Sequence, residues 1–247
     1  MDAYTSFAEV YDLFMDNVPY EEWGEFLSKL FKEYGIEDGL LLDLGCGTGK
    51  LTRIMETKGY DMIGIDNSFD MLDIARTNSN ESILYLMQDM REFELYGTVR
   101  GIYSACDCVN YILEEEELRE VFALANNYLD PGGVFVFDIN TPYKYYELLG
   151  ENTFAETREE GSFIWENYFD EEEQMNEYDL TLYIKDEDGR FQRFQESHYQ
   201  RCYEIETIKR LLEEAGMEFV AAYDGYTTNP ASAESEKVLF IAREHGK

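Results

Sequence analysis

The chain has 247 residues, 45% of them hydrophobic, which is enough for one sizeable α/β domain or for such a domain with an insertion. Its 53 acidic residues outnumber 20 basic ones, and the formal charge of −33 disfavours contact with nucleic-acid phosphates and anionic membranes. Four cysteines without a CxxC pair and only two histidines argue against a zinc site, so no metal is expected.

The first 35 residues predict two helices. Aromatic and apolar residues recur at helical spacing from Tyr4 to Met15, and again from Pro19 until Gly35 stops the pattern. The segment has neither a basic start nor a long apolar run. No signal peptide is therefore expected, and the chain is expected to be cytoplasmic with reduced thiols.

Strands and helices alternate from residue 40 onward, which predicts a mostly parallel sheet with helices on both faces. The strands are expected at 40–44, 61–65, 83–87, 99–106 and 134–140, and the helices between them at 50–58, 68–76 and 114–129. The sequence DPGG, at 130–133, predicts a turn before the fifth strand.

The pattern changes after residue 150. Residues 151–203 read as an antiparallel meander with a hairpin turn at "DEDG", and they are expected to form an insertion rather than an independent domain. A helix at 204–216 and strands at 218–223 and 236–244 then return. The main domain is therefore expected to comprise residues 1–150 and 204–247, with residues 1–35 as lid helices.

A glycine cluster follows the first strand in "LLLDLGCGTGKLTRI", residues 40–54. Such a turn brings backbone N–H groups close to a ligand, which could be a nucleoside triphosphate, a dinucleotide or S-adenosylmethionine. A P-loop requires Gly and Ser or Thr where this chain has Leu44 and Leu51, and the dinucleotide motif requires a third Gly where it has Lys50. The acid at the end of the second strand, Asp66, suits a ribose in any adenosine cofactor.

The order of several motifs resembles the class I S-adenosylmethionine-dependent methyltransferases. The D-x-G-x-G-x-G pattern, the strand-two acid in "GYDMIGIDNSFDML", the "SILYLMQDM" segment, "SACDCVNYI" after strand four and "DPGGVFVFDIN" together cover most of residues 4–245. The branch that it resembles consists of small bacterial proteins with an inserted antiparallel sheet. The resemblance implies a Rossmann-like, doubly wound α/β fold with seven strands, the last of them antiparallel and inserted.

The resemblance also implies the cofactor, S-adenosylmethionine, with S-adenosylhomocysteine as product. Asp43 would face the ammonium group of the cofactor or brace the glycine loop, Asp66 would hold the ribose, and Asp89 would take the adenine amino group. Met71 would touch adenine or pack in the core, and Ser68 is expected to cap the helix. The residues expected to bind the cofactor are Asp43, Gly45, Cys46, Gly47, Gly49, Asp66, Asn67, Met71, Asp89, Met90 and Cys106.

The methyl acceptor is expected to meet Tyr20, Trp23, Asn110 and Tyr111. Tyr11 and His198 are the candidate catalytic residues, although Tyr11 and Trp23 also lie on apolar helix faces, and a histidine in this position is often structural. A general base is needed only if the acceptor arrives protonated, since positioning supplies much of the rate in a methyl displacement.

The expected function is methyl transfer to nitrogen or oxygen of a small-molecule acceptor. Two alternatives stay open: a methyltransferase that acts on a protein or RNA, and a non-catalytic module that only binds the cofactor. No nucleic-acid partner and no membrane partner is expected, and the chain is expected to be a monomer or homodimer. The insertion would cap the active site or form a dimer contact.

Overall fold

The computed structural model describes residues 7–247, so the part of the first predicted helix that includes Tyr4 lies outside the described residues. The helices are α1 (Ala8–Phe14), α2 (Tyr20–Glu33), α3 (Lys50–Thr57), α4 (Phe69–Thr77), α5 (Glu115–Tyr128) and α6 (Ile205–Glu214), with short helical segments η1 (Cys108–Tyr111) and η2 (Lys144–Leu149). The strands are β1 (Gly39–Leu44), β2 (Tyr60–Asp66), β3 (Leu84–Met87), β4 (Val99–Ser104), β5 (Leu129–Asn140), β6 (Thr153–Thr157), β7 (Gly161–Asp170), β8 (Met175–Lys185), β9 (Phe191–Arg201), β10 (Glu218–Asp224) and β11 (Lys237–Arg243).

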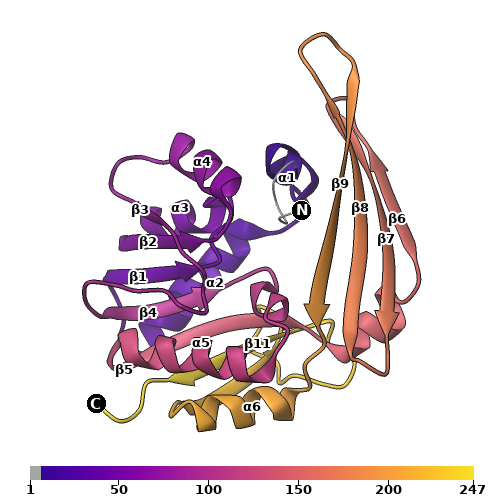
Figure 1. Ribbon diagram of the computed structural model, residues 1–247. Coiled ribbons are helices and arrows are strands. Elements are labelled where there is room, and N and C mark those ends of the chain that lie inside the picture. The colour runs from indigo at the N-terminus through magenta and orange to yellow at the C-terminus, as the bar shows by residue number, and fades with distance from the viewer. Residues whose placement is uncertain (1–6) are drawn as a thin grey trace.

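Seven strands form the main sheet in the order β10-β11-β5-β4-β1-β2-β3 (Figure 1). The pairs β5-β4, β4-β1, β1-β2 and β2-β3 are parallel, whereas β11 runs antiparallel to both of its neighbours. Strand order reverses between β1 and β4, and in open α/β sheets ligands bind outside the carboxyl ends of the strands at such a point. The expected seven-stranded, doubly wound fold is confirmed.

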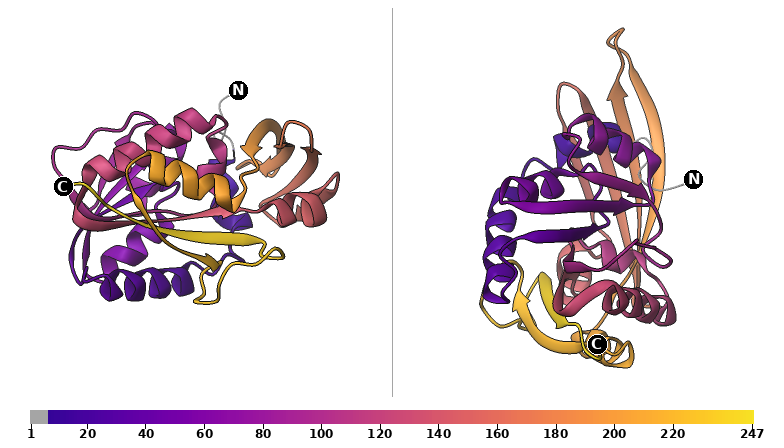
Figure 2. Two further views of the ribbon diagram at one scale, coloured as in Figure 1. Left: turned by 90° about the horizontal axis from the view of Figure 1, so that it is seen from below. Right: turned by 90° about the vertical axis from the view of Figure 1, so that its left-hand side faces the viewer.

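Helices cover both faces of this sheet, as Figure 2 shows from below. Within β5, Phe135 and Phe137 belong to the core beneath α5 and α6, while Val134 and Val136 belong to the core beneath α2, α3 and α4. Alternate strand residues point to opposite faces, so the continuous apolar run "VFVF" supplies both cores at once.

The turn expected at DPGG appears as an irregularity inside β5. Val99 of β4 pairs with Leu129 of β5, and Gly101 of β4 pairs with Val134 of β5. Between these two pairs the chain advances by two residues in β4 but by five residues in β5. The three additional residues loop out, and Gly132 takes the left-handed conformation with φ of +77°. The structure thus has a strand irregularity where the sequence predicts a turn, and the strand begins at Leu129 and not at Val134.

A second sheet, in the order β6-β7-β8-β9 and antiparallel throughout, is inserted between η2 and α6. Helix α1 lies between it and the main domain (Figure 1). Val10 and Phe14 of α1 pack against Leu180 and Leu182 of β8, and the Arg158 guanidinium binds the Asp16 carboxylate after α1 with N–O distances of 2.5 and 2.9 Å. The lid position expected for the N-terminal segment therefore depends on the insertion.

Candidate active site

The glycine loop joins β1 to α3 and is fixed by the end of β2. The amides of Gly45 and Cys46 donate to the carbonyl oxygen of Ile65 at 2.8 and 2.9 Å. The amide of Gly47 donates to Oδ2 of Asp66 at 2.8 Å, and the other oxygen of this carboxylate accepts from the amide of Ser68. Asp66 therefore sets the distance between the glycine loop and the start of α4.

Helix α4 begins as the sequence predicts. The Ser68 side chain accepts a hydrogen bond from the amide of Met71 at 3.3 Å, so it caps the first turn. This leaves the Asp66 carboxylate free of the capping role and in contact with the cavity that the loop encloses.

Two glycines of this loop, Gly47 and Gly49, have different surroundings. Gly47 and Gly49 have φ of +53° and +71°, which side chains rarely adopt. A Cβ at Gly47 would meet no protein atom within 4 Å, whereas one at Gly49 would lie 2.4 Å from the phenol oxygen of Tyr85. Gly47 keeps space open for a ligand, and Gly49 allows α3 to approach β3.

A cavity of about 400 Å³ opens above the carboxyl ends of β1, β2 and β4, within the size range of small-molecule sites. Most of the predicted site residues meet there. Those that line the cavity are Tyr11, Tyr20, Asp43, Gly45, Cys46, Gly47, Asp66, Asn67, Met71, Asp89, Met90, Cys106 and Tyr111. Gly49, Trp23, Asn110 and His198 do not line it.

Asp43 ends β1 and is only 2% exposed. Its Oδ2 accepts hydrogen bonds from the Thr52 hydroxyl at 2.6 Å and from the Tyr103 phenol at 3.0 Å. Burial raises the pKa of Asp43 to about 7, although both hydrogen bonds act in the opposite direction. The carboxyl group thus braces α3 and β4 and also lines the cavity.

Asp89 lies at the opposite rim with a partner that the sequence did not predict. The Arg91 guanidinium binds both of its oxygens, at 2.9 and 2.6 Å, and reaches Glu117 of α5 at 3.1 Å. These hydrogen bonds lower the pKa of Asp89 despite its partial burial. Asp89 is therefore ionised and held in place where the adenine amino group is expected.

The turn after β4 has an unusual backbone. Cys106 and Asp107 both take left-handed φ values, +61° and +52°, which costs on the order of 1–3 kcal/mol for each non-glycine residue. The Asp138 carboxylate, on β5 and 0% exposed, accepts from both amides at 3.1 and 2.5 Å. Burial raises the pKa of the Cys106 thiol to about 12, so this cysteine lines the cavity as a neutral group.

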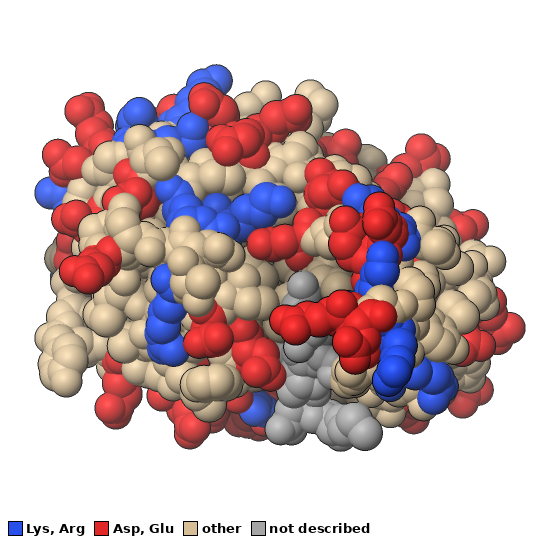
Figure 3. All heavy atoms as spheres, turned by 90° about the horizontal axis from the view of Figure 1, so that it is seen from above, with Lys and Arg blue, Asp and Glu red and all other residues tan. Residues whose placement is uncertain are grey.

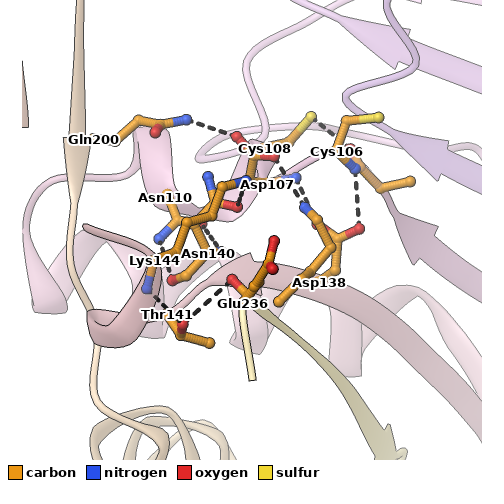
Figure 4. A network of polar contacts seen from close by, with 12 residues as sticks. Cys106, Asp107, Cys108, Asn110, Asp138, Asn140, Thr141, Lys144, Gln200 and Glu236 are labelled. Atoms are coloured by element: carbon orange, nitrogen blue, oxygen red, sulfur yellow. Dashed lines mark hydrogen bonds and ion pairs between the residues drawn. The ribbon is translucent and has the colours of Figure 1, made fainter. Parts of the chain in front are cut away.

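Figure 4 shows the polar network behind this turn. The Lys237 ammonium of β11 lies 3.0 Å from one oxygen of Asp107 and 3.0 Å from one oxygen of Asp138. The Gln200 side chain of β9 donates to the other oxygen of Asp107 at 2.8 Å. The network connects the inserted sheet to the wall of the cavity.

The predicted acceptor residues divide into two groups. Tyr11, Tyr20 and Tyr111 reach the cavity from α1, α2 and η1, and burial raises the pKa of the Tyr11 phenol. Trp23 instead stacks on Tyr226 at 4.2 Å between ring centroids. Trp23 and Tyr226 both pack against the hydrophobic core, which agrees with the interpretation of Trp23 as a packing residue.

Asn110 is fully buried and joins three segments. Its amide donates to the carbonyl oxygen of Arg201 at 2.8 Å, and its oxygen accepts from the amide of Asn140 at 2.9 Å. It therefore ties η1 to β5 and β9 rather than reaching the cavity.

His198 lies on β9, directly behind Tyr111. Its Nδ1 is 3.2 Å from the Tyr111 phenol oxygen, and its Nε2 is 3.5 Å from Oε2 of Glu196. Its Nδ1 thus contacts a residue that lines the cavity, although His198 does not line it itself.

Several residues at the site carry no local sequence signal. Asp12 of α1 accepts from the Thr48 hydroxyl of the glycine loop at 2.8 Å, which attaches the lid to the loop. Asp138 and Lys237 stand out only as charges within apolar strand patterns, and nothing in the chain predicts that they meet. Among the residues 7–247, no group of three His, Cys, Asp or Glu side chains is placed to hold a metal ion, and no helix has the length and apolar character to cross a membrane.

The cavity fits S-adenosylmethionine by its chemistry. The ligand carries a sulfonium, an ammonium group and a ribose, and the cavity offers the carboxyl groups of Asp43 and Asp66 together with the open space at Gly47. Met71 and Met90 add apolar side chains to the lining. Charge, hydrogen-bond acceptors and space therefore agree with the cofactor that the motif order implies.

Comparisons with known proteins give the same result. A family model described as a methyltransferase domain matches residues 41–133. A protein of Geobacillus sp. (strain WCH70) named "Putative methyltransferase" is 34% identical over 246 residues, which are 98% of this chain and 100% of that protein. A dTDP-3-amino-3,4,6-trideoxy-alpha-D-glucopyranose N,N-dimethyltransferase of Streptomyces venezuelae is 32% identical over 133 residues, 53% of this chain and 56% of that one.

Among solved structures, an S-adenosylmethionine-dependent methyltransferase from Clostridium acetobutylicum ATCC 824 superposes with a TM-score of 0.87 and 28% identity, over 99% of this chain and 100% of that chain. The agreement covers the inserted sheet and α1 as well as the cofactor domain, because almost no residue of either chain is left out. The chain therefore belongs to the class I S-adenosylmethionine-dependent methyltransferases, and S-adenosylmethionine is its cofactor.

Proposed function

We propose that this methyltransferase transfers the methyl group to nitrogen or oxygen of a small-molecule acceptor. The observation that carries the proposal is the aromatic lining of the cavity, to which α1, α2 and η1 contribute Tyr11, Tyr20 and Tyr111. Phenol rings offer apolar faces and hydrogen-bonding tips, which suits a small polar molecule. A polymer would need an open groove, and here α1 is attached on both sides, to the glycine loop and to the inserted sheet.

Charge supports the same proposal. Figure 3 shows acidic side chains around one whole face of the molecule, with smaller basic groups between them. A surface of this kind repels RNA, and the amino-sugar dimethyltransferase among the relatives acts on a small molecule by its name. The four free thiols fit a reducing compartment, so we place the protein in the cytoplasm.

The residues of the cavity divide the work. The sulfonium of the cofactor supplies an activated methyl carbon. Asp43 and Asp66 bind the ammonium group and the ribose, and Asp89 with Met71 and Met90 orients the adenine. Tyr11, Tyr20 and Cys106 exclude water around the transferring carbon, so that positioning and desolvation supply much of the acceleration.

The inserted sheet, residues 151–203, acts in this proposal as a cap over the main domain, residues 1–150 and 204–247. Gln200 and Glu196 of β9 contact the Asp107 turn and the start of α1, which are the two elements that enclose the acceptor. A sheet that caps the main domain on one face can form a dimer contact through its other face. The proposal therefore holds for a monomer and for a homodimer.

The test is transfer of tritiated methyl groups to a bacterial cell extract, separated afterwards into dialysable, protein and RNA fractions. Label in the dialysable fraction supports the proposal, and label confined to protein or RNA refutes it. Asp66→Ala removes the ribose contact and is expected to lose transfer. Asp61→Asn, an exposed acid on the same strand, is the matched control.

A further inference from the structure

Tyr111 is a cavity residue whose hydroxyl group has polar partners on the inserted sheet. Its phenol oxygen lies 2.6 Å from the phenol oxygen of Tyr178 and 3.2 Å from Nδ1 of His198, both on the inserted sheet. The Tyr111 side chain also lines the cavity, next to Cys106 and Ile112. One residue therefore lines the cavity and also contacts a buried imidazole through its hydroxyl group.

The imidazole of His198 is buried against aromatic and acidic side chains. It is 1% exposed, and the Tyr178 ring stacks on it at 4.6 Å with an angle of 6° between the planes. The titratable groups against it include Tyr111 and Tyr178 and, 3.5 Å from Nε2, the Glu196 carboxylate. The Glu196 carboxylate therefore lies on the Nε2 side of the ring, and the Tyr111 hydroxyl lies on the Nδ1 side.

Glu196 is itself held in place. It is 3% exposed, and its Oε1 accepts from the amide of Phe7 at 2.9 Å, which leaves Oε2 turned toward His198. Burying a carboxylate, an imidazole and a phenol together is expensive, and apolar side chains would join the same elements at lower cost. Proton transfer among the three groups explains why polar side chains occupy these positions despite their free-energy cost.

We propose that Tyr111, His198 and Glu196 form a proton relay that takes the proton from the acceptor atom. The proposal rests on the proposed function, because it supposes an acceptor at the Tyr111 end of the cavity. Tyr111 is the catalytic residue, and His198 and Glu196 are positioning residues that act through it. The relay makes the site competent for a hydroxyl or a protonated amine, which positioning alone does not activate.

In the transfer step, the acceptor atom passes its proton to the Tyr111 oxygen, and Tyr111 passes its own proton to Nδ1 of His198. The freed lone pair of the acceptor forms the bond to the methyl carbon, the carbon–sulfur bond breaks, and its electron pair stays on sulfur. The imidazolium that forms is compensated by the Glu196 carboxylate, and the Tyr178 hydroxyl stabilises the developing charge on Tyr111.

The relay requires one tautomer of the resting imidazole. Nδ1 must be unprotonated to accept from Tyr111, and Nε2 must carry the hydrogen, directed at Glu196. A purely structural contact has no such requirement, since a ring that donates from Nδ1 to the Tyr111 oxygen would join the same elements.

The tautomer can be read directly, because the chain has only two histidines, His198 and His245. The full chain, labelled with ¹⁵N in histidine and saturated with S-adenosylhomocysteine, is examined by long-range ¹H–¹⁵N correlation. We expect His198 as the Nε2–H form, and its Nδ1 signal is expected to move in Tyr111→Phe. The same signal stays in place in Tyr199→Phe, an exposed tyrosine on β9 whose phenol donates to Glu177. The Nδ1–H form, or an unchanged signal in Tyr111→Phe, overturns the relay.

A kinetic test uses single-turnover transfer of labelled methyl to the dialysable extract. Tyr111→Phe and His198→Asn are expected to lower the rate about 100-fold or more, with S-adenosylhomocysteine affinity within a factor of about two of the parent chain. A reduction below about threefold in both variants overturns the proposal. If the parent chain labels no small molecule, the proposed function fails, and the tautomer still decides the relay, since that measurement needs no acceptor.

Discussion

Replacing Asp43 by Asn is expected to change the stability of the protein and its affinity for the cofactor in opposite directions. In the folded chain burial raises the pKa of this carboxyl group from 3.8 to about 7. The folded state then holds more protons than the unfolded state between about pH 4 and pH 7. The protonated Asp43 carboxyl group favours the folded state below this window, and that contribution to the free energy of unfolding is lost as pH rises through it. Three pKa units correspond to roughly 4 kcal/mol at about 1.4 kcal/mol per unit.

Asn is uncharged at every pH, and its oxygen can accept from both Thr52 and Tyr103, as Oδ2 of Asp43 does. We therefore expect the free energy of unfolding of Asp43→Asn to exceed that of the parent chain at pH 8, by up to about 4 kcal/mol. The difference should shrink toward zero near pH 4. Urea titrations at both pH values measure it, and the comparison with the parent chain cancels the titration of acids that do not interact with Asp43. The charge of Asp66 helps to raise the pKa of Asp43 and is therefore part of the measured difference.

The affinity for S-adenosylhomocysteine should fall in the variant, whereas its free energy of unfolding rises. The ammonium group of S-adenosylhomocysteine is expected to ionise Asp43, so that binding at pH 6 releases about one proton from the parent chain and none from the variant. Calorimetry in two buffers of different ionisation enthalpy measures this release, and the variant is expected to bind at least about tenfold more weakly, about 1.4 kcal/mol. Equal proton release in both chains, or a variant less stable at pH 8 than the parent, would refute the reasoning.

Three further predictions follow from the same geometry. Gly47→Ala should weaken S-adenosylhomocysteine binding in calorimetry more than it lowers the melting temperature, and Gly49→Ala should do the reverse, since its Cβ would clash with β3. Lys237→Met leaves the fully buried Asp138 without its cation, which should cost about 3 kcal/mol in urea unfolding; a loss below about 1 kcal/mol contradicts the role of the ion pair. Asp12→Ala releases α1 from the glycine loop and should raise the dissociation rate of S-adenosylhomocysteine in stopped-flow experiments, whereas an unchanged rate would mean that α1 does not control release.

The cofactor side of the site could be predicted from sequence because its residues sit at strand ends and in one turn. Asp43 and Asp66 end adjacent parallel strands, so their proximity follows from the alternation of strands and helices alone. The order of the main sheet was predictable for the same reason, with the last strand placed by the resemblance.

The acceptor side was less predictable because it is made by contacts between distant segments. Nothing near Tyr111 in the sequence indicates His198 or Glu196, since the register of β9 decides which of its side chains faces η1. A shift of one residue would turn His198 to the opposite face of the inserted sheet. Trp23 and Asn110 were assigned to the acceptor from residue type, and their positions depend on Tyr226 and Arg201, which local patterns do not connect with them.

The place of β11 has a consequence for synthesis of the chain. It lies between β5 and β10, so until residues 237–243 have left the ribosome both neighbours expose an unpaired edge. The glycine loop and its strands can already be assembled by then, but Lys237, which neutralises two acids beneath the Cys106 turn, arrives with β11. The nascent protein would thus gain its cofactor pocket first and its finished acceptor wall last, with its greatest tendency to aggregate in the interval.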